Sequence, residues 1–144
     1  MKKIGIVMGA VLLIAFLSTD ALAQRAVEAN TLKISPARYK NSYIKLQDKF
    51  INFRSAVPLA LTKAGYTLDK YIAFGTAEAG MRCFMRRNAE SEEEIAGLKR
   101  GDQITICGYV KQPKATVADD SRWKHKEKLD MYIIEVSKIS PGWN

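Results

Sequence analysis

The most informative part of the chain lies near its end and reads Leu98-Lys-Arg-Gly101-Asp102-Gln-Ile104-Thr-Ile106-Cys-Gly108-Tyr-Val110, followed later by Leu129-Asp-Met131-Tyr-Ile133-Ile-Glu-Val136-Ser-Lys-Ile139. Ile104 and Ile106 alternate with polar or small residues, which is the period of a half-buried β-strand. The Gly-Asp turn before them indicates where a short helix ends. The stretch therefore predicts a helix, a turn, a strand, a polar excursion and a closing strand.

Earlier parts of the chain predict three more strands. Residues 39–53 favour a long first strand, and Gln47-Asp48-Lys49 interrupts its alternation, which predicts a bend or bulge there. Residues 71–75 and 81–86 are shorter runs joined by the glycine-containing loop 76–80, as in a hairpin. Between the first two strands, Pro58 and Gly65 bound a short helix.

A second helix is predicted from Ser91 to Leu98. Ser91-Glu-Glu-Glu94 has the spacing of a capping box, and glutamates in a first helical turn also suit the helix dipole. This acidic run therefore has a structural explanation, and we assign it no metal or catalytic role.

This order of elements resembles the OB-fold, in the group often called anticodon-binding-like, over roughly Arg38 to Ile139. The resemblance implies an all-β protein with a minor helix: a five-stranded Greek-key barrel whose helix lies between strands three and four. Residues 38–144 are expected to form this single domain. Alternation within the strands predicts a core that includes Ile44, Leu46, Phe74, Met81, Met85, Ile104, Ile106, Val110, Ile133 and Val136.

The first residues have the layout of a secretory signal peptide. Two lysines precede an uncharged apolar run, Ile4–Leu17, and Ala21-Leu22-Ala23 is a small-x-small cleavage site. The alternative is a membrane anchor, but the run is 14 residues long, and a spanning helix needs about 20. We expect cleavage of residues 1–23 after Ala23, and a mature periplasmic or secreted bacterial protein that is not membrane-embedded. Residues 24–37 are expected to be a flexible lead-in, with a short helix through Arg25 to Leu32 as the alternative.

The chain is basic, with a formal net charge of +8 and only two cysteines. A positive excess favours anionic partners, although it also serves solubility alone. Export favours a disulfide between Cys83 and Cys107. Alternation instead places Cys83 inward and Cys107 outward, and opposite faces prevent a bridge unless a bulge at Gly108 intervenes. Both outcomes remain open from the sequence.

Motifs for catalysis, metals and cofactors are not recognisable in the sequence. The single histidine, His125, lies among basic residues with no partner to orient it as a base. The two cysteines and this histidine do not supply a four-ligand zinc site, and no phosphate-binding loop occurs. The sequence therefore predicts a protein that is not an enzyme and has no cofactor, with a hydrolase built from scattered residues as a less favoured alternative.

A basic and aromatic constellation is the remaining candidate site. Alternation puts Arg82 and Arg86 on the outer face of strand three, with Arg87 beside them, and Tyr43 lies on strand one. The long polar connection 111–128 contributes Lys111 and Trp123. In OB-folds, strands two and three and the adjoining loops hold ligands. We therefore predict ligand contacts at Arg82, Arg86, Arg87, Lys111, Trp123 and Tyr43, against the alternative of an ordinary solvated face.

Two functions fit these observations. The first is a non-enzymatic binding module of the cell envelope that recognises an anionic ligand or a protein partner on the barrel face. The second is a single-stranded nucleic-acid-binding protein outside the cytoplasm, since bases stack on aromatic side chains in a positive groove.

Overall fold

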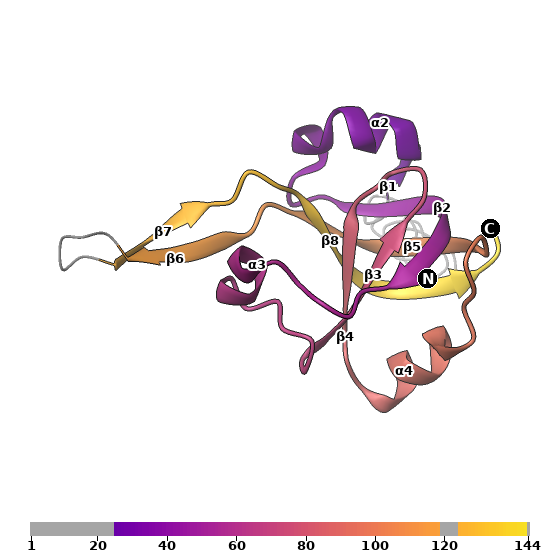
Figure 1. Cartoon of the computed structure of the whole chain (residues 1–144). Coiled ribbons are helices and arrows are strands. Elements are labelled where there is room, and N and C mark those ends of the chain that lie inside the picture. Colours follow the sequence, from indigo (N-terminus) through magenta and orange to yellow (C-terminus); the bar gives the residue numbers. More distant parts are fainter. Residues whose placement is uncertain (1–24, 119–123, 144) are drawn as a thin grey trace, which may run out of the picture.

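The computed structural model describes residues 25–118 and 124–143, and the side chains of 116–118 and 124–125 lie outside that description. Five strands close into a barrel (Figure 1): β2 (Tyr43–Phe53), β3 (Tyr71–Thr76), β4 (Arg82–Arg86), β5 (Gln103–Lys111) and β8 (Ile133–Pro141). Their order is β2-β3-β4-β8-β5, and pairing of β2 with β5 closes the ring. β4 and β8 run parallel, whereas the other neighbouring barrel strands are antiparallel. This is the expected OB-fold.

The barrel interior is built from the alternating residues. All ten residues predicted for the core are buried. Nine of them belong to the main cluster inside the barrel, whereas Ile133 belongs to a second cluster on the outside. A bulge lies at Gly108, the position that the sequence left open for one, because the β5–β8 register shifts between Cys107 and Gly108.

Strand β2 differs from the expected bend. Its ladder with β5 continues without interruption from Tyr43 to Lys49, and the irregularity lies further on, between Phe50 and Phe53, in the pairing with β3. Asp48 therefore keeps an inward position and is fully buried (0% exposed). Its carboxylate accepts backbone hydrogen bonds from Lys49, Glu78 and Ala79 at 2.7–2.9 Å. Because these hydrogen bonds satisfy the buried carboxylate, the strand does not have to bend at Asp48 to expose it to solvent.

Helix α4 (Ala89–Ala96) lies between β4 and β5, as predicted. Its capping box was assigned to the wrong residues. Asn88 is the N-cap, and its side chain accepts from the Ser91 amide, while the Ser91 hydroxyl accepts from the Asn88 amide. Because Asn88 is an effective cap, the helix begins earlier than the Ser91 motif alone indicates.

The lead-in packs against the barrel and contains a short helix, shifted along the chain from the one considered over Arg25 to Leu32. It forms β1 (Arg25–Val27), helix α2 (Ala29–Ile34) and a 3₁₀ turn (Pro36–Tyr39). β1 pairs in parallel with β2, and Leu32 of α2 is fully buried in the main core (0% exposed). Burial of this side chain stabilises the contact. The predicted signal peptide, residues 1–23, lies outside the described residues.

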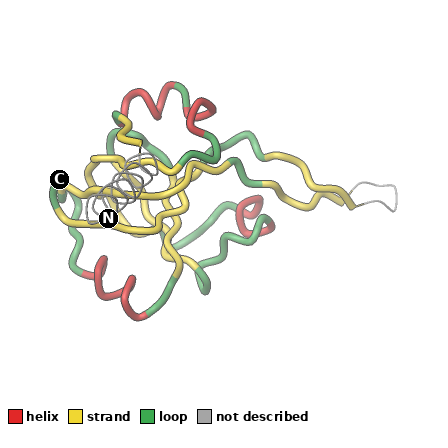
Figure 2. The backbone as a smooth tube through the Cα atoms, turned by 180° about the vertical axis from the view of Figure 1, so that it is seen from behind, coloured by secondary structure: helices red, strands yellow, loops and turns green. Residues whose placement is uncertain are grey.

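Two insertions leave the barrel. The first connects β2 to β3 and contains helix α3 (Leu59–Lys63), close to the predicted limits. The second is the polar stretch after β5. It was expected to be a loop too long for a tight hairpin, yet it pairs as an antiparallel ribbon of β6 (Lys114–Ala118) and β7 (Lys124–Lys128). The ribbon projects from the barrel as an arm, as both views show (Figures 1 and 2).

In the part of the chain that the structure describes, none of the helices combines the length and the apolar character needed to cross a membrane.

Candidate binding groove

Arg82 and Arg86 lie on the outer face of β4, as alternation predicted, but Phe84 between them is buried there. Phe84 belongs to the second apolar cluster, with Leu61, Tyr66, Ala73 and Ile133. Leu61 and Tyr66 come from the insertion between β2 and β3, so this insertion covers part of the face formed by β3 and β4. OB-folds usually hold ligands on that face. In this protein the insertion covers part of it, and the exposed surface lies beside the covered part.

A groove of about 310 Å³ crosses the outside of four neighbouring strands, β3, β4, β8 and β5. Its rims carry the rings of Tyr71 and Tyr109. Between them lie Arg86 from β4, and Glu135 and Ser137 from β8; Phe84, Met85, Asn88 and Val136 complete the lining. The lining therefore mixes aromatic and apolar side chains with a guanidinium, a carboxylate, a hydroxyl and an amide, which together could orient a small ligand.

One rim combines aromatic rings with a cation. Tyr109 is 43% exposed, and its ring centroid lies 4.9 Å from that of Tyr43. The Lys111 ammonium lies 5.4 Å from the Tyr109 centroid. Tyr43 is also fixed by a 2.7 Å hydrogen bond between its hydroxyl and that of Ser137. Tyr43 and Lys111, which were predicted as ligand contacts from the sequence, therefore both lie against Tyr109, which was not predicted.

The opposite rim pairs an arginine with a tyrosine. The Arg86 guanidinium lies 5.4 Å from the centroid of Tyr71. The Arg86 side chain is exposed, and the structure describes no ion pair for it. Its charged donors are therefore available to an anionic group in the groove.

Glu135 places a carboxylate between these two cationic rims. One of its oxygens accepts a hydrogen bond from the Tyr66 hydroxyl. Burial, assisted by that bond and by the charge of Glu135, raises the pKa of Tyr66, so the phenol stays a donor. This bond also ties the insertion to β8. The groove can therefore hold a ring between aromatic side chains, donate to an anion and accept from a ligand hydroxyl or amine.

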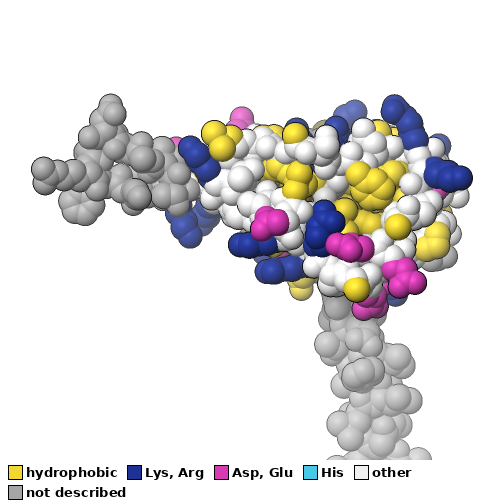
Figure 3. Space-filling model, turned by 60° about the horizontal axis from the view of Figure 1, so that its bottom comes forward, with side chains coloured by type: hydrophobic (Ala, Val, Ile, Leu, Met, Phe, Trp, Pro, Cys, Tyr) yellow, Lys and Arg dark blue, Asp and Glu magenta, His cyan; other side chains and the backbone are white. Residues whose placement is uncertain are grey.

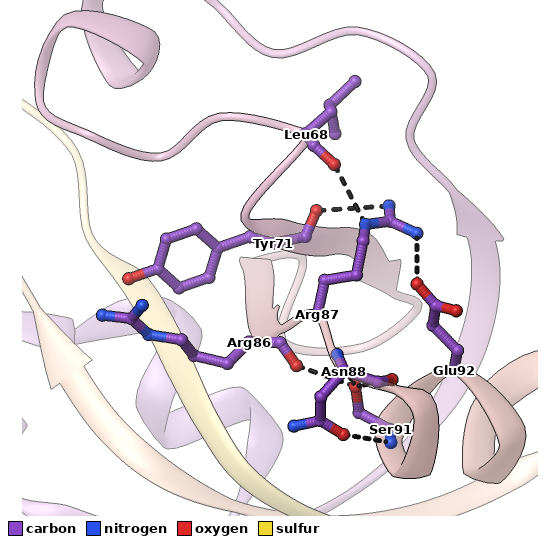
Figure 4. A network of polar contacts seen from close by, with 7 residues as sticks. All are labelled: Leu68, Tyr71, Arg86, Arg87, Asn88, Ser91 and Glu92. Carbon is purple, nitrogen blue, oxygen red and sulfur yellow. Dashed lines mark hydrogen bonds and ion pairs between the residues drawn. The ribbon is translucent and has the colours of Figure 1, made fainter.

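Arg87 has a structural role (Figure 4). Its guanidinium donates to the carbonyl oxygens of Leu68 (3.1 Å) and Tyr71 (3.4 Å) and to the carboxylate of Glu92 (3.2 Å). These contacts join the insertion, β3 and α4, and they turn Arg87 away from Arg86. Arg82 stands at the other end of β4, opposite Gly75, and does not line the groove. Trp123 lies outside the described residues.

The sequence analysis missed Tyr71, Tyr109, Glu135 and Ser137. Their strands were predicted correctly, so outward alternation was the available signal: Tyr109 is flanked by Gly108 and the buried Val110, and Glu135 precedes the buried Val136. Alternation shows which face of a strand a side chain lies on, but it does not show which strands are neighbours in the sheet. The neighbour relation β4-β8-β5, which gathers these side chains, comes from the closed barrel.

The two cysteines are buried free thiols, so the structure does not contain the candidate disulfide. Their strands flank β8, where Cys83 pairs with Ile134 and Cys107 with Lys138, four residues further along. At about 3.3 Å per residue, this offset alone exceeds the Cα separation of about 7 Å that a bridge tolerates. The bulge at Gly108 does not bring them together.

We expect neither thiol to react with iodoacetamide in the native protein. Burial, with the charge of Asp48, raises the pKa of the Cys83 thiol, and only thiolates react readily. After unfolding in urea without reductant, mass spectrometry of the full-length protein should show two alkylations. An unfolded protein that takes up no label would instead contain a Cys83–Cys107 bridge.

Within residues 25–118 and 124–143, His, Cys, Asp and Glu side chains do not assemble into a group of three that could hold a metal ion.

Comparisons with known proteins support the fold alone. No protein-family model and no curated protein sequence matches the chain. Among solved structures, it is similar to a putative aspartyl-tRNA synthetase from Leishmania major Friedlin, with a TM-score of 0.51 and 8% sequence identity. The match covers 93% of this chain and 26% of the synthetase chain, so the protein spans about a quarter of that enzyme's length. This likeness agrees with an OB-type barrel.

Proposed function

We propose that this protein is a non-enzymatic binding module of the bacterial cell envelope that holds an anionic, ring-bearing ligand in the groove between Tyr71 and Tyr109. The observation that carries the proposal is the pairing of an aromatic ring with a cation at each rim, Arg86 with Tyr71 and Lys111 with Tyr109. Such pairs offer a flat surface for a ring and charged donors for its acidic substituent. The placement in the envelope rests on the predicted signal peptide.

A single-stranded oligonucleotide is the second candidate. The exposed Tyr109 ring supports it, because bases stack on such rings largely without regard to sequence. The likeness in fold to an aspartyl-tRNA synthetase points the same way without identifying a ligand. The volume of about 310 Å³ suits one ring at a time, so a longer strand would extend beyond the groove.

Replacing Arg86 with glutamine tests the groove, and Arg82→Gln is the matched control on the same strand and face. Arg86 lines the groove and Arg82 does not. Calorimetric titration would use nucleoside monophosphates and oligouronates as soluble ring-bearing anions. We expect at least one to bind, and Arg86→Gln to weaken it by about tenfold to a hundredfold, the range for a lost hydrogen bond to a charged group. Arg82→Gln should bind normally.

The groove is not the binding site if the two arginine variants lose the same affinity. It is also not the site if the wild-type protein binds none of the compounds. Thermal unfolding of both variants provides the folding control, because Arg82 is half-buried whereas Arg86 is exposed and its charge should contribute little to stability.

Tyr109→Ala tests the oligonucleotide candidate. Fluorescence anisotropy with labelled oligothymidylate should show about a 5- to 100-fold weaker complex, because stacking contributes about 1–3 kcal/mol per base. Phe53→Ala is the control, since Phe53 is exposed to a similar degree (41% against 43%) but lies away from the groove. Binding of the wild type should also weaken steeply with salt. Salt-insensitive binding, or equal losses in both variants, would exclude this candidate.

A further inference from the structure

Like charges face each other where the arm leaves the barrel. The register of the ribbon pairs Lys114 of β6 directly with Lys128 of β7. Directly opposed side chains have Cβ atoms about 5 Å apart, and opposed like charges destabilise a β-ribbon. Both lysines are exposed, so the pairing does not serve packing of the arm.

A third lysine is held in place beside them. Lys40 lies just before β2, and its ammonium donates to the Gln112 side-chain oxygen at 3.2 Å. The amide nitrogen of Gln112 donates in turn to the Leu129 carbonyl at 3.0 Å. Because both ends of this amide are engaged, its oxygen is fixed toward Lys40. Three separate segments of the chain therefore bring lysines to one place.

These lysines also lie close enough to act on one another electrostatically. The close approach of the Lys128 ammonium, then burial, then the charges of Lys128 and Lys114 lower the pKa of Lys40. Glu127, the one carboxylate on β6 and β7, pairs with Ala115 and so occupies the other face of the ribbon. Figure 3 shows Lys and Arg side chains gathered where the arm meets the barrel.

We propose that Lys40, Lys114 and Lys128 form a binding site for a phosphate group. Lysine ammonium groups bind phosphate as point charges, each with three donors. A tetrahedral dianion among them would turn mutual repulsion into attraction. The site shares no residue with the groove and does not depend on the function proposed for it. The phosphate group has two candidate sources, a soluble phosphate compound or a phospholipid headgroup at a membrane surface.

The test uses pyrophosphate as the probe, titrated into the full chain in 0.15 M salt and followed by NMR of the lysine side chains. We expect Lys114→Gln and Lys128→Gln each to raise Kd at least about tenfold. Lys126→Gln is the matched control, because Lys126 is an exposed lysine of the same strand whose partner is Thr116. Its Kd should rise clearly less than in the cluster variants, because Lys126 lies two residues, about 7 Å, further along the arm and salt partly screens its charge.

A second measurement needs no ligand: the pKa of Lys40 should rise in Lys128→Gln and stay unchanged in Lys126→Gln. Sedimentation with phosphatidylglycerol vesicles, against phosphatidylcholine vesicles, then separates the two sources. Co-sedimentation that pyrophosphate competes away indicates a headgroup, and pyrophosphate binding without co-sedimentation indicates a soluble compound. The proposal is overturned if neither pyrophosphate nor the vesicles bind, or if Lys126→Gln loses as much as the cluster variants.

Discussion

Replacing Asp48 with alanine is expected to destabilise the barrel by about 3 kcal/mol or more. The carboxylate is fully buried, and it accepts hydrogen bonds from the amides of Lys49, Glu78 and Ala79. Alanine removes every one of these acceptors and leaves the amide of the buried Ala79 unpaired, and each buried amide in that state costs about 1–3 kcal/mol. Since whole domains are stable by about 5–15 kcal/mol, urea unfolding followed by circular dichroism will detect the change clearly.

Asp48→Asn should fall between the wild type and alanine. Oδ1 accepts from Lys49 and Glu78, whereas Oδ2 accepts from Ala79, so an asparagine oxygen can keep two bonds while its amide opposes the third donor. Asp130→Asn is the control, because this aspartate is exposed and exposed substitutions usually change stability by under about 0.5 kcal/mol. Equal stability of the alanine variant and the wild type would show that the hairpin loop does not depend on this carboxylate.

Gly108→Ala should destabilise the protein by about 3 kcal/mol. A Cβ at this position would overlap the Glu135 carbonyl oxygen and lie 2.9 Å from the Val136 Cα. Both are backbone atoms of β8, so the clash cannot be relieved by rotating a side chain. The strands must separate where β5 and β8 help to close the barrel. Thermal or urea unfolding measures the loss.

The matched control is Gly97→Ala. A Cβ at Gly97 meets no atom within 4 Å, and its φ of −87° is open to any residue. This change should be neutral or slightly stabilising, because alanine restricts the unfolded chain. Because Tyr109 and Glu135 adjoin the bulge, Gly108→Ala should also weaken the binding of any ligand in the groove. Similar stability of the two variants would mean that the close approach of β5 and β8 at Gly108 is easily relieved.

Alternation predicted the barrel well because each strand buries one face. Ile104 and Ile106 read as inward residues from their spacing alone, and both are almost completely buried. The same reasoning placed Arg82 and Arg86 outward. It failed at Asp48, where a charged residue occupies an inward position. Three amides satisfy this carboxylate, and two of them come from a loop about 30 residues away in the sequence.

The candidate groove was only partly predictable. Tyr43, Arg86 and Lys111 were selected by residue type and position, and the structure gathers them at or beside the groove. Arg87 was selected by the same criteria, yet it binds Leu68, Tyr71 and Glu92. Nothing in a single strand's pattern distinguishes an outward arginine that faces solvent from one that joins a loop to a helix.

Residue types and their spacing were enough to predict the number and order of the barrel strands, the faces that they bury, and the helix between strands three and four. These features depend on side-chain period and on backbone conformation, both of which are local. Three other features became visible only in the folded protein: an insertion covers part of the usual OB-fold face, the polar connection pairs into an arm, and three lysines meet at the root of that arm. Those features depend on contacts between segments far apart in the sequence, whose free energy no local pattern contains.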